Sequence, residues 1–291
     1  MIQTETKYTF PERRAGSPFW ALENLPPFPA VAARLLQVVS KRDVHLSEIG
    51  KFISAEPVLA AEVLQIANSA LFGLECQVKS ITQAIMILGL ERIKGISLTR
   101  AFGSYLRPAL RIESLHRCWQ NSLAGALLAE KVARSCGIDA DVSYTAGLLR
   151  DIGRLALLVK YPIPFANMLA VTQDNGFDLM TTERALFDVD HCQAGSWVMS
   201  SVPFPPELRD VVAWHHEDLS WEPFGLVQLV QVADQMADSL GFSVLALPES
   251  SWPDFAAALR QLPDHARTRF VHERDDLRKE LGARIEILAR L

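Results

Sequence analysis

The amino-acid sequence predicts an all-α protein folded as a two-lobed helical bundle. Apolar residues recur at helical spacing along most of the chain, and no pair of alternating apolar segments joined by a tight turn indicates a β-hairpin. A polar, proline-containing stretch at 106–113 divides the predicted helices into two groups. Hydrophobic residues make up 49% of the chain, which is enough to give both lobes a core.

The composition narrows the classes of function. The formal net charge of -5 argues against a general nucleic-acid binder, which usually has a basic balance or a basic stripe. The four cysteines form no Cys-x-x-Cys pair, so neither a zinc knuckle nor a disulfide framework is predicted. Reduced thiols, a polar amino-terminal segment unlike a signal peptide, and the lack of an uninterrupted apolar run of about 20 residues together predict a cytoplasmic protein.

The first predicted lobe consists of short helices with recognisable ends. The proline-rich segment 25–29 should lead rigidly into a helix, and Pro57 suits the first turn of a later one. Ser80 and Gln83 have the spacing of a capping box, in which two side chains satisfy free backbone N–H groups at a helix start. A further helix is expected over 91–102. The expected buried faces contain Val31, Leu35, Leu36, Val39, Ile49, Phe52, Ile53, Leu59, Val63, Ile66 and Ala67.

The second predicted lobe is centred on the segment 143–160, which is apolar almost all round and predicts a single central helix. Asp190 and Gln193 have the spacing to cap another helix, and Pro205 and Pro206 are placed to begin the one after it. The expected buried faces around this centre contain Trp119, Leu123, Leu127, Ala194, Trp197, Val198, Leu208, Val211, Val212, Leu226, Val230, Ala233 and Ala237.

The carboxy-terminal segment 268–291 is charged and amphipathic. Its apolar residues recur every three to four positions, at Phe270, Leu277, Leu281, Ile285 and Leu288. Because Arg274 and Arg284 interrupt a strict heptad, packing against the body is favoured over a coiled-coil seam. Self-association through this segment is the alternative.

Several polar residues fall where the helical pattern predicts burial. Asp151 lies in the most apolar segment, and Asp234 lies beside an apolar stripe. His215, with His216 next to it, falls on an apolar face, and His191 occupies the first turn of a capped helix. A buried carboxylate is costly unless it is paired or bound to a metal, and imidazole with carboxylate is a typical donor set for zinc, iron or manganese. Two interpretations stay open: a metal site between helices, or an arginine-paired carboxylate among hydrogen-bonded core histidines.

Three segments of the second lobe resemble HD-superfamily phosphohydrolases. Residues 147–154, Gly-Leu-Leu-Arg-Asp-Ile-Gly-Arg, are similar to the helix that carries that superfamily's His-Asp pair. Residues 215–217, His-His-Glu, resemble the paired histidines of its cyclic-dinucleotide phosphodiesterase branch, the HD-GYP type. Residues 232–238 resemble the distal aspartate helix of that branch. The resemblance implies an HD-superfamily-like second lobe.

The first lobe instead resembles HDOD domains, the HD-related output domains of bacterial signalling. The similar segments are 25–29, 66–73 and 80–89, and with the second lobe the resemblance runs from about Leu22 to about Asp238. Several motifs in the same order make it highly specific. It implies a regulatory relative of the HD phosphohydrolases.

The chain departs from the phosphohydrolase pattern at two metal-binding histidines, where it has Asn121 and Arg150. A guanidinium stays protonated and offers no lone pair to a metal. The Gly-Tyr-Pro signature expected after the paired histidines is also missing, since residues 218–223 read Asp-Leu-Ser-Trp-Glu-Pro. The resemblance therefore implies a degenerate site of Asn121, Arg150, Asp151 and Asp234, which has lost one of the two metals used in hydrolysis.

The remaining residues of the pattern are Asp151, His191, His215 and His216, which by resemblance match the second metal position. They are candidate ligands for a single divalent metal, and no other cofactor is expected. Consecutive residues of a helix point about 100° apart, so Arg150 can face away and leave this position intact. The alternative is that its guanidinium turns in, replaces the missing cation and neutralises the neighbouring carboxylate.

Three classes of function follow. A non-catalytic regulatory module, which binds another protein or a nucleotide, explains the decayed site and the lack of any P-loop, Gly-x-Ser-x-Gly or dinucleotide-binding motif. The second class is a metal-dependent phosphohydrolase with an unorthodox site. The third is a DNA-binding regulator, suggested by two short helices within 81–98. The first is our prediction: the protein is not an enzyme, its partners are signalling proteins, and neither membrane nor nucleic acid is expected.

The predicted organisation has four parts. A flexible leader at 1–17 precedes an amino-terminal lobe at 18–110. An HD-like lobe follows at 111–245, and a helical extension at 246–291 completes the chain.

Overall fold

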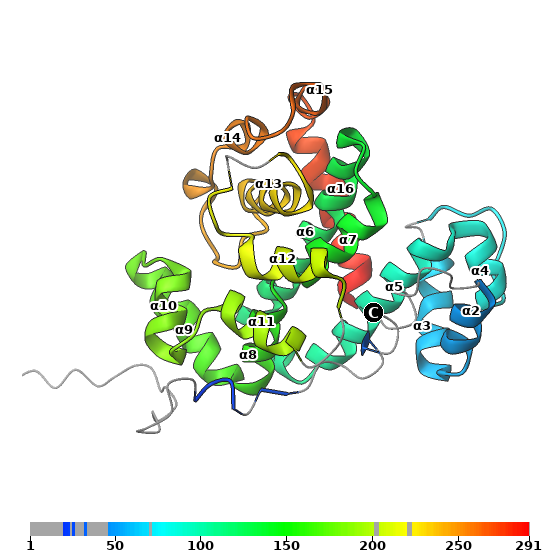
Figure 1. The fold of residues 1–291 in the computed structure, drawn as a ribbon, viewed down its shortest axis with the longest axis horizontal. Coiled ribbons are helices and arrows are strands. Elements are labelled where there is room, and N and C mark those ends of the chain that lie inside the picture. Colours follow the sequence, from blue (N-terminus) through cyan, green and yellow to red (C-terminus); the bar gives the residue numbers. More distant parts are fainter. Residues whose placement is uncertain are drawn as a thin grey trace, which may run out of the picture.

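The computed structural model is helical almost throughout, and none of its described residues forms a β-strand, which confirms the all-α prediction. Figure 1 shows its two lobes. The helices α2 (Leu46–Ser54), α3 (Pro57–Ala67) and α4 (Ile81–Leu88) pack together at one end of α5 (Leu90–Leu106), and the later helices form a larger body. The structure describes residues 20–23, 25–26, 32–33, 46–69, 72–200, 204–219 and 223–290.

Some of the expectations concern residues outside those ranges. They include the leader at 1–17, most of the proline-rich entry at 25–29, and parts of 66–73 and 218–223. The helix expected to carry Val31, Leu35, Leu36 and Val39 lies outside them as well. The boundaries of the four predicted parts therefore stay predictions.

The helix ends of the small lobe follow from local chemistry. Pro57 begins α3, whose buried side chains are the predicted Leu59, Val63, Ile66 and Ala67. At the start of α4, the Ser80 Oγ accepts a hydrogen bond from the Gln83 N–H at 3.1 Å. The Gln83 side chain accepts from the Lys79 N–H at 2.8 Å, one residue before the expected donor. The helix expected over 91–102 runs four residues further, to the end of α5.

The large body is built around α6 (Glu113–Cys136), which follows the short 3-10 turn η1 (Ala109–Arg111) in the predicted seam. The single helix predicted over 143–160 is wrong: the chain forms α7 (Ala140–Leu149) and α8 (Ile152–Lys160), with a break at Arg150 and Asp151. At Asp151 the backbone has φ -96° and ψ 22°, which is not helical. Arg150 still has helical backbone angles, with φ -48° and ψ -43°, so the change of direction begins at Asp151.

Close approach of backbones fixes α7 and α8 against their neighbours. A Cβ atom at Gly147 would lie 2.7 Å from the Gly125 carbonyl oxygen on α6. A Cβ atom at Gly153 would lie 2.0 Å from the His191 carbonyl oxygen, at the start of α11 (His191–Ser200). Because only glycine tolerates these distances, the two glycines of the 147–154 motif set how closely the helices pack.

Four further helices enclose the polar centre: α9 (Pro162–Asn175), α10 (Leu179–Phe187), α12 (Pro206–Trp214) and α13 (Leu226–Ser239). The predicted cap of α11 is present, since Asp190 Oδ1 accepts from the Gln193 N–H at 2.8 Å and Gln193 Oε1 accepts from the Asp190 N–H at 3.0 Å. Trp197, expected on the buried face of α11, is 41% exposed instead. Ala194, Val198 and Met199 point into the core there, and the indole lies on the flank of that stripe.

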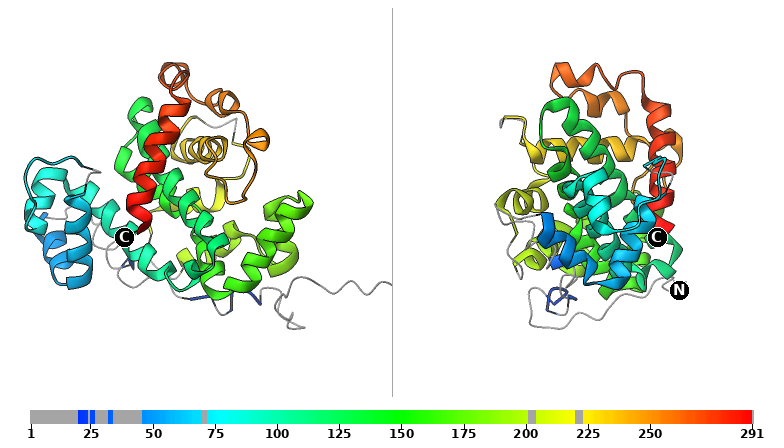
Figure 2. Two further views of the ribbon diagram at one scale, coloured as in Figure 1. Left: turned by 180° about the vertical axis from the view of Figure 1, so that it is seen from behind. Right: turned by 90° about the vertical axis from the view of Figure 1, so that its right-hand side faces the viewer.

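The carboxy-terminal part consists of η2 (Glu249–Ser251), α14 (Phe255–Leu259), α15 (Asp264–Arg267) and α16 (Arg274–Arg290). The segment expected to be helical from residue 268 therefore becomes a long helix only at Arg274. All five predicted apolar residues are buried, and α16 lies along α6, as Figure 2 shows. The prediction that this segment packs on the body is confirmed.

Among the described helices, none combines the length and the apolar composition needed to cross a membrane by itself. One pair, 140–160 with 162–175, passes the test jointly but is bent by 116°.

Candidate functional site

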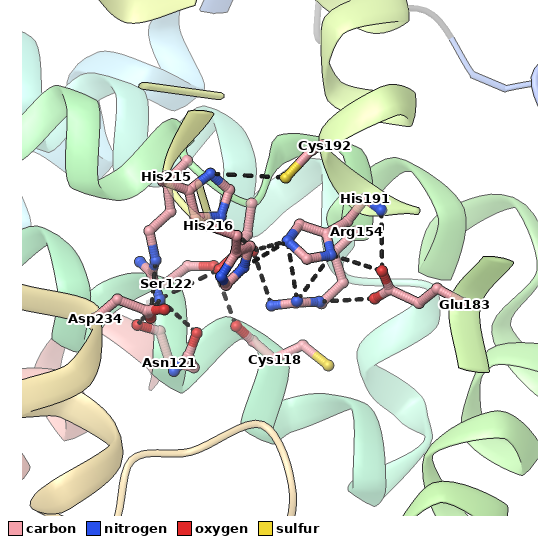
Figure 3. A network of polar contacts seen from close by, with 12 residues as sticks. Cys118, Asn121, Ser122, Arg154, Glu183, His191, Cys192, His215, His216 and Asp234 are labelled. Atoms are coloured by element: carbon pink, nitrogen blue, oxygen red, sulfur yellow. Dashed lines mark hydrogen bonds and ion pairs between the residues drawn. The ribbon is translucent and has the colours of Figure 1, made fainter. Parts of the chain in front are cut away.

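Seven helices of the large body contribute residues to one polar centre (Figure 3): α6, α7, α8, α10, α11, α12 and α13. Asn121 comes from α6, Asp234 from α13, and Arg150 and Asp151 from the α7–α8 break. His191 begins α11, while His215 and His216 follow α12. The structure thus brings together all seven residues that the sequence singled out. It adds Arg154 of α8, Glu183 of α10 and Cys192 of α11.

Arg150 turns into the centre and is completely buried. Its Nη2 donates to Asp234 Oδ1 at 2.7 Å and to Asn121 Oδ1 at 2.5 Å, and its Nη1 donates to the Gly147 carbonyl at 2.8 Å. The guanidinium lies in space left by Gly125, where a Cβ atom would be 2.0 Å from Nη1. The alternative in which Arg150 faces away is therefore wrong, because the missing side chain at Gly125 admits the guanidinium.

Asp151 is an ion-paired buried carboxylate, as one of the two sequence interpretations expected. Its Oδ2 lies 3.2 Å from Arg150 Nη2, and its Oδ1 lies 2.8 Å from Arg154 Nη1. Burial acts to raise the pKa of this carboxyl, but Arg154 and Arg150 outweigh it and hold the pKa well below its usual range. Asp151 therefore stays ionised in the interior.

Glu183 and Arg154 orient His191 from its other side. Glu183 Oε2 accepts from the His191 backbone N–H at 2.9 Å and lies 2.6 Å from His191 Nδ1. Arg154 Nε donates to Glu183 Oε1 at 3.2 Å. Burial acts to raise the pKa of Glu183, but His191 and Arg154 together lower it to about 2. A proton on Nδ1 of His191, facing this carboxylate, leaves Nε2 as the atom directed to the centre.

The three histidines lie against one another. The ring centroids of His215 and His216 are 4.2 Å apart, and His216 Nε2 lies 3.0 Å from His191 Nε2. His215 Nδ1 lies 3.0 Å from the Val211 carbonyl, to which it can donate. Burial, then His215 and His191, lower the pKa of His216 to about 4, so this imidazole is neutral at neutral pH.

Two buried acceptor atoms have no hydrogen bond among the described residues: His215 Nε2 and Asp151 Oδ1, which lie 3.7 Å apart. Arg154 ion-pairs with the second of them without forming a hydrogen bond of good geometry. Arg150 and Arg154 thus supply donors on both sides of the centre, and the two acceptors without a hydrogen bond lie between Asp151 and His215.

The two metal positions implied by the resemblance differ in how well their residues fit an ion. Around Asn121 and Asp234 the Arg150 guanidinium fills the space and takes the oxygen atoms, so the residues do not fit a metal there. Asp151, His191, His215 and His216 do fit one divalent ion. Two acceptor atoms without a hydrogen bond, Asp151 Oδ1 and His215 Nε2, lie there. Nδ1 of His191 faces the Glu183 carboxylate and Nδ1 of His215 faces the Val211 carbonyl, which orients both rings. Arg154 competes for the carboxylate oxygen.

Cys192 brings sulfur close to this cluster, since its Sγ lies 3.9 Å from His215 Nδ1. Burial, followed by Asp190 and Asp151, raises the pKa of the Cys192 thiol. A thiol that keeps its proton is a poor metal ligand. Cys192 therefore adds a neutral contact to the histidines.

The residues that sequence reasoning missed carried weak signals. Arg154 follows Asp151 by three residues within an apolar helix, a spacing that places both on one face. Glu183 lies four residues from both Leu179 and Phe187, so it occupies an apolar-face position of α10. Both are charges at positions predicted to be buried, the same signal that identified Asp151.

Comparison with known proteins relates this arrangement to a family. The HDOD domain family matches residues 25–218 of the chain. An uncharacterized protein of Treponema pallidum (strain Nichols) is 22% identical over 217 residues, which are 74% of this chain and 41% of that protein. The chain therefore spans less than half the length of this curated relative.

Solved structures share the fold over nearly the whole chain. An HDOD domain protein of unknown function from Geobacter sulfurreducens is 23% identical, with a TM-score of 0.73 and coverage of 93% of this chain and 95% of that one. A candidate signal transduction protein from Marinobacter aquaeolei VT8 is 19% identical, with a TM-score of 0.69 and coverage of 92% and 60%. A candidate phosphohydrolase from Shewanella amazonensis SB2B is 24% identical, with a TM-score of 0.61 and coverage of 94% and 93%.

Proposed function

The chain belongs to the HDOD domain family, and from its polar centre we propose that it is a non-catalytic regulatory module that binds a signalling protein in the bacterial cytoplasm. The observation that carries the proposal is the Arg150 guanidinium, which is buried between Asn121, Asp151 and Asp234. It supplies a permanent positive charge where hydrolysis by related folds would need a metal.

The Arg150 guanidinium differs from a metal in what it can do. It neutralises Asp151 and Asp234, but it has no vacant coordination position and cannot lower the pKa of a bound water as a metal does. Its hydrogen bonds to Asp234, Asn121 and the Gly147 carbonyl fix it in one geometry. A site held in this way stabilises the fold and offers no nucleophile.

A single divalent ion remains compatible with the other half of the site. Asp151, His191, His215 and His216 would hold it, and when bound it would supply Lewis acidity. With the other metal position filled by Arg150, we assign such an ion a structural role.

The DNA-binding alternative finds little support in the α4–α5 corner. Arg92 forms an ion pair with Glu130, and Arg100 forms one with Glu62. Lys94 and Arg100 are buried. Cations that are occupied inside the fold are not available to phosphates, so this corner acts as a helix–helix joint.

An activity assay tests the proposal. The purified protein is incubated with cyclic dinucleotides and a generic phosphodiester, with manganese or ferrous iron added. We expect no turnover, and none after Asn121→His combined with Arg150→His, because the Gly-Tyr-Pro signature is missing as well. Metal-dependent turnover that Asp151→Ala abolishes would refute the proposal. Recovery of a specific signalling protein with the tagged chain from its native cell would supply the partner.

A further inference from the structure

A cluster of cations lies where α5, α6 and α16 meet, outside the polar centre. At its base is Glu130 of α6, whose side chain is only 3% exposed. Three guanidiniums form ion pairs with this one carboxylate: those of Arg92 on α5, Arg134 on α6 and Arg284 on α16. Arg134 Nη2 lies 2.6 Å from Glu130 Oε1, and Arg284 Nη2 lies 3.4 Å from Glu130 Oε2. One carboxylate is therefore shared by cations from three helices.

The network continues towards the surface through Glu280 of α16. Lys131 Nζ lies 2.6 Å from Glu280 Oε2, and Arg284 Nη1 lies 3.6 Å from Glu280 Oε1. Lys131 and Arg134 are three residues apart on α6, so their side chains share one face of that helix. Lys131, Arg134 and Arg284 therefore form one continuous group, which we call the basic patch.

Positive charge is in excess in this network. A buried carboxylate needs a cation beside it, and Arg92 alone balances the charge of Glu130. The three cations of the basic patch then face only the carboxylate of Glu280. Asp141, which lines a small hollow beside Arg92 and Arg284, is a further carboxylate close to the network. With Asp141 included, the cations among the described residues of this region still outnumber the carboxylates.

Hydrogen-bond donors are in excess as well. Each guanidinium carries five N–H donors, so three arginines bring far more donors than the two oxygens of Glu130 can accept. Among the described residues, Arg284 Nε is buried without a hydrogen-bond partner. The other cations reach solvent, because the side chain of Arg134 is 56% exposed and that of Lys131 is 33% exposed. The basic patch can therefore bind further anionic groups from outside the protein.

The charge of the basic patch is opposite in sign to that of the whole chain, whose formal net charge is -5. An acidic ligand is disfavoured by the net charge and attracted at this one place, which favours a single docking position. Glu280 and Arg284 lie beyond residue 218, where the match to the HDOD domain family ends. The patch is therefore a feature of this chain for which the family match does not account.

We propose that the basic patch of Lys131, Arg134 and Arg284 docks an acidic segment of a partner protein, whose carboxylates these cations bind. The inference rests on the proposed regulatory function and names the chemistry by which the signalling partner is recognised. A segment bound here lies beside α5, the helix on which the small lobe packs. Nucleic acid fits less well, because its phosphates need a longer basic stripe than three cations provide.

Fluorescence anisotropy tests the proposal, with a labelled peptide of eight glutamates titrated by the purified chain at low ionic strength. We expect the peptide to bind. Arg134→Gln removes the most exposed cation of the patch and should weaken binding about two- to fivefold, the worth of one partly solvated ion pair. Glu280→Gln removes the carboxylate that competes with the peptide for Lys131 and Arg284, and should strengthen binding about two- to fivefold. A cluster with only a structural role gives no such strengthening.

The matched controls are variants of the exposed ion pair between Arg260 and Asp254, which lies outside the patch. Arg260→Gln and Asp254→Asn change the net charge by the same amounts as the two patch variants, and both should leave peptide binding unchanged. No peptide binding, equal effects of patch and control variants, or tighter binding of single-stranded DNA of eight nucleotides with the same dependence on Arg134 would overturn the inference. Turnover of a phosphodiester would instead refute the proposed function, so the two failures are distinguishable.

Discussion

The two halves of the polar centre differ in how completely their polar atoms are hydrogen-bonded. Around Arg150, the guanidinium donates to Asp234, to Asn121 and to the Gly147 carbonyl. The side chains of Arg150, Asn121 and Asp234 have no buried polar atom without a hydrogen-bond partner. Around His215, the ring Nε2 and Asp151 Oδ1 lie 3.7 Å apart with no hydrogen bond. One half is fully hydrogen-bonded within the chain, and in the other Asp151 Oδ1 is held by the ion pair with Arg154 alone.

Under the proposed non-catalytic function, the contrast shows how an arginine can keep the helices of such a site in place. Removing a metal leaves buried carboxylates uncompensated, which is costly in the interior. An arginine restores the charge balance and adds directional hydrogen bonds, so the helices can stay in place.

The largest loss of stability is expected from removing the Asp151 carboxylate, which lies between the two halves. Asp151→Ala leaves Arg150 and Arg154 without this partner and should lower the free energy of unfolding by about 3–5 kcal/mol, measured by chemical denaturation. The control is Asp264→Ala, whose exposed ion pair with Arg267 should be worth less than about 1 kcal/mol. Equal stability of Asp151→Ala and wild type would show that the carboxylate is not part of a buried ion pair.

The sequence predicted those features that depend on neighbours along the chain. The buried face of α3, from Leu59 to Ala67, follows from helical spacing. The reciprocal cap of Asp190 and Gln193 follows from a spacing of three residues. The resemblance to known motifs supplied the grouping of Asp151 with the histidines, which spacing could not reveal.

The features that could not be predicted depend on contacts between distant segments. The break between α7 and α8 lies inside a segment whose apolar pattern is that of one helix, and the contacts of Arg150 with Asn121 and Asp234 join segments far apart in the sequence. Glu183 contacts His191 only once α10 and α11 are packed. The place for the guanidinium is provided by Gly125, a glycine with no distinguishing sequence signal.

A smaller loss of stability should come from filling the space beside Gly125 that the Arg150 guanidinium occupies. Gly125→Ala puts a Cβ atom 2.0 Å from Arg150 Nη1, so the guanidinium must move and its hydrogen bonds must weaken. We expect a loss of about 1–3 kcal/mol in the free energy of unfolding. Gly282→Ala on α16 is the matched control, because no atom lies within 4 Å of the new methyl group and alanine favours a helix. If both variants are equally stable, the guanidinium is not held as described.

A further effect on stability should depend on pH. The pKa of Asp238 is raised from near 3.8 to about 7, so in the folded state its ionised form is disfavoured. Between about pH 4 and 7 the unfolded chain loses this proton first, and the carboxyl therefore destabilises the fold progressively as pH rises. Asp238→Asn should gain stability relative to wild type across that window in a denaturation series. A stability difference that does not change with pH would show that the pKa is unshifted.

The central claim is that Arg150 holds the site together in place of a metal, and a double-mutant cycle with Asp234 tests it most directly. The free energy of unfolding is measured for wild type, Arg150→Met, Asp234→Asn and the double variant, each with and without a chelator. The account predicts that the double variant loses less than the sum of the single losses, by about 1–3 kcal/mol, and that the chelator leaves this coupling unchanged. Additive losses, or a coupling that disappears when metal is removed, would contradict it.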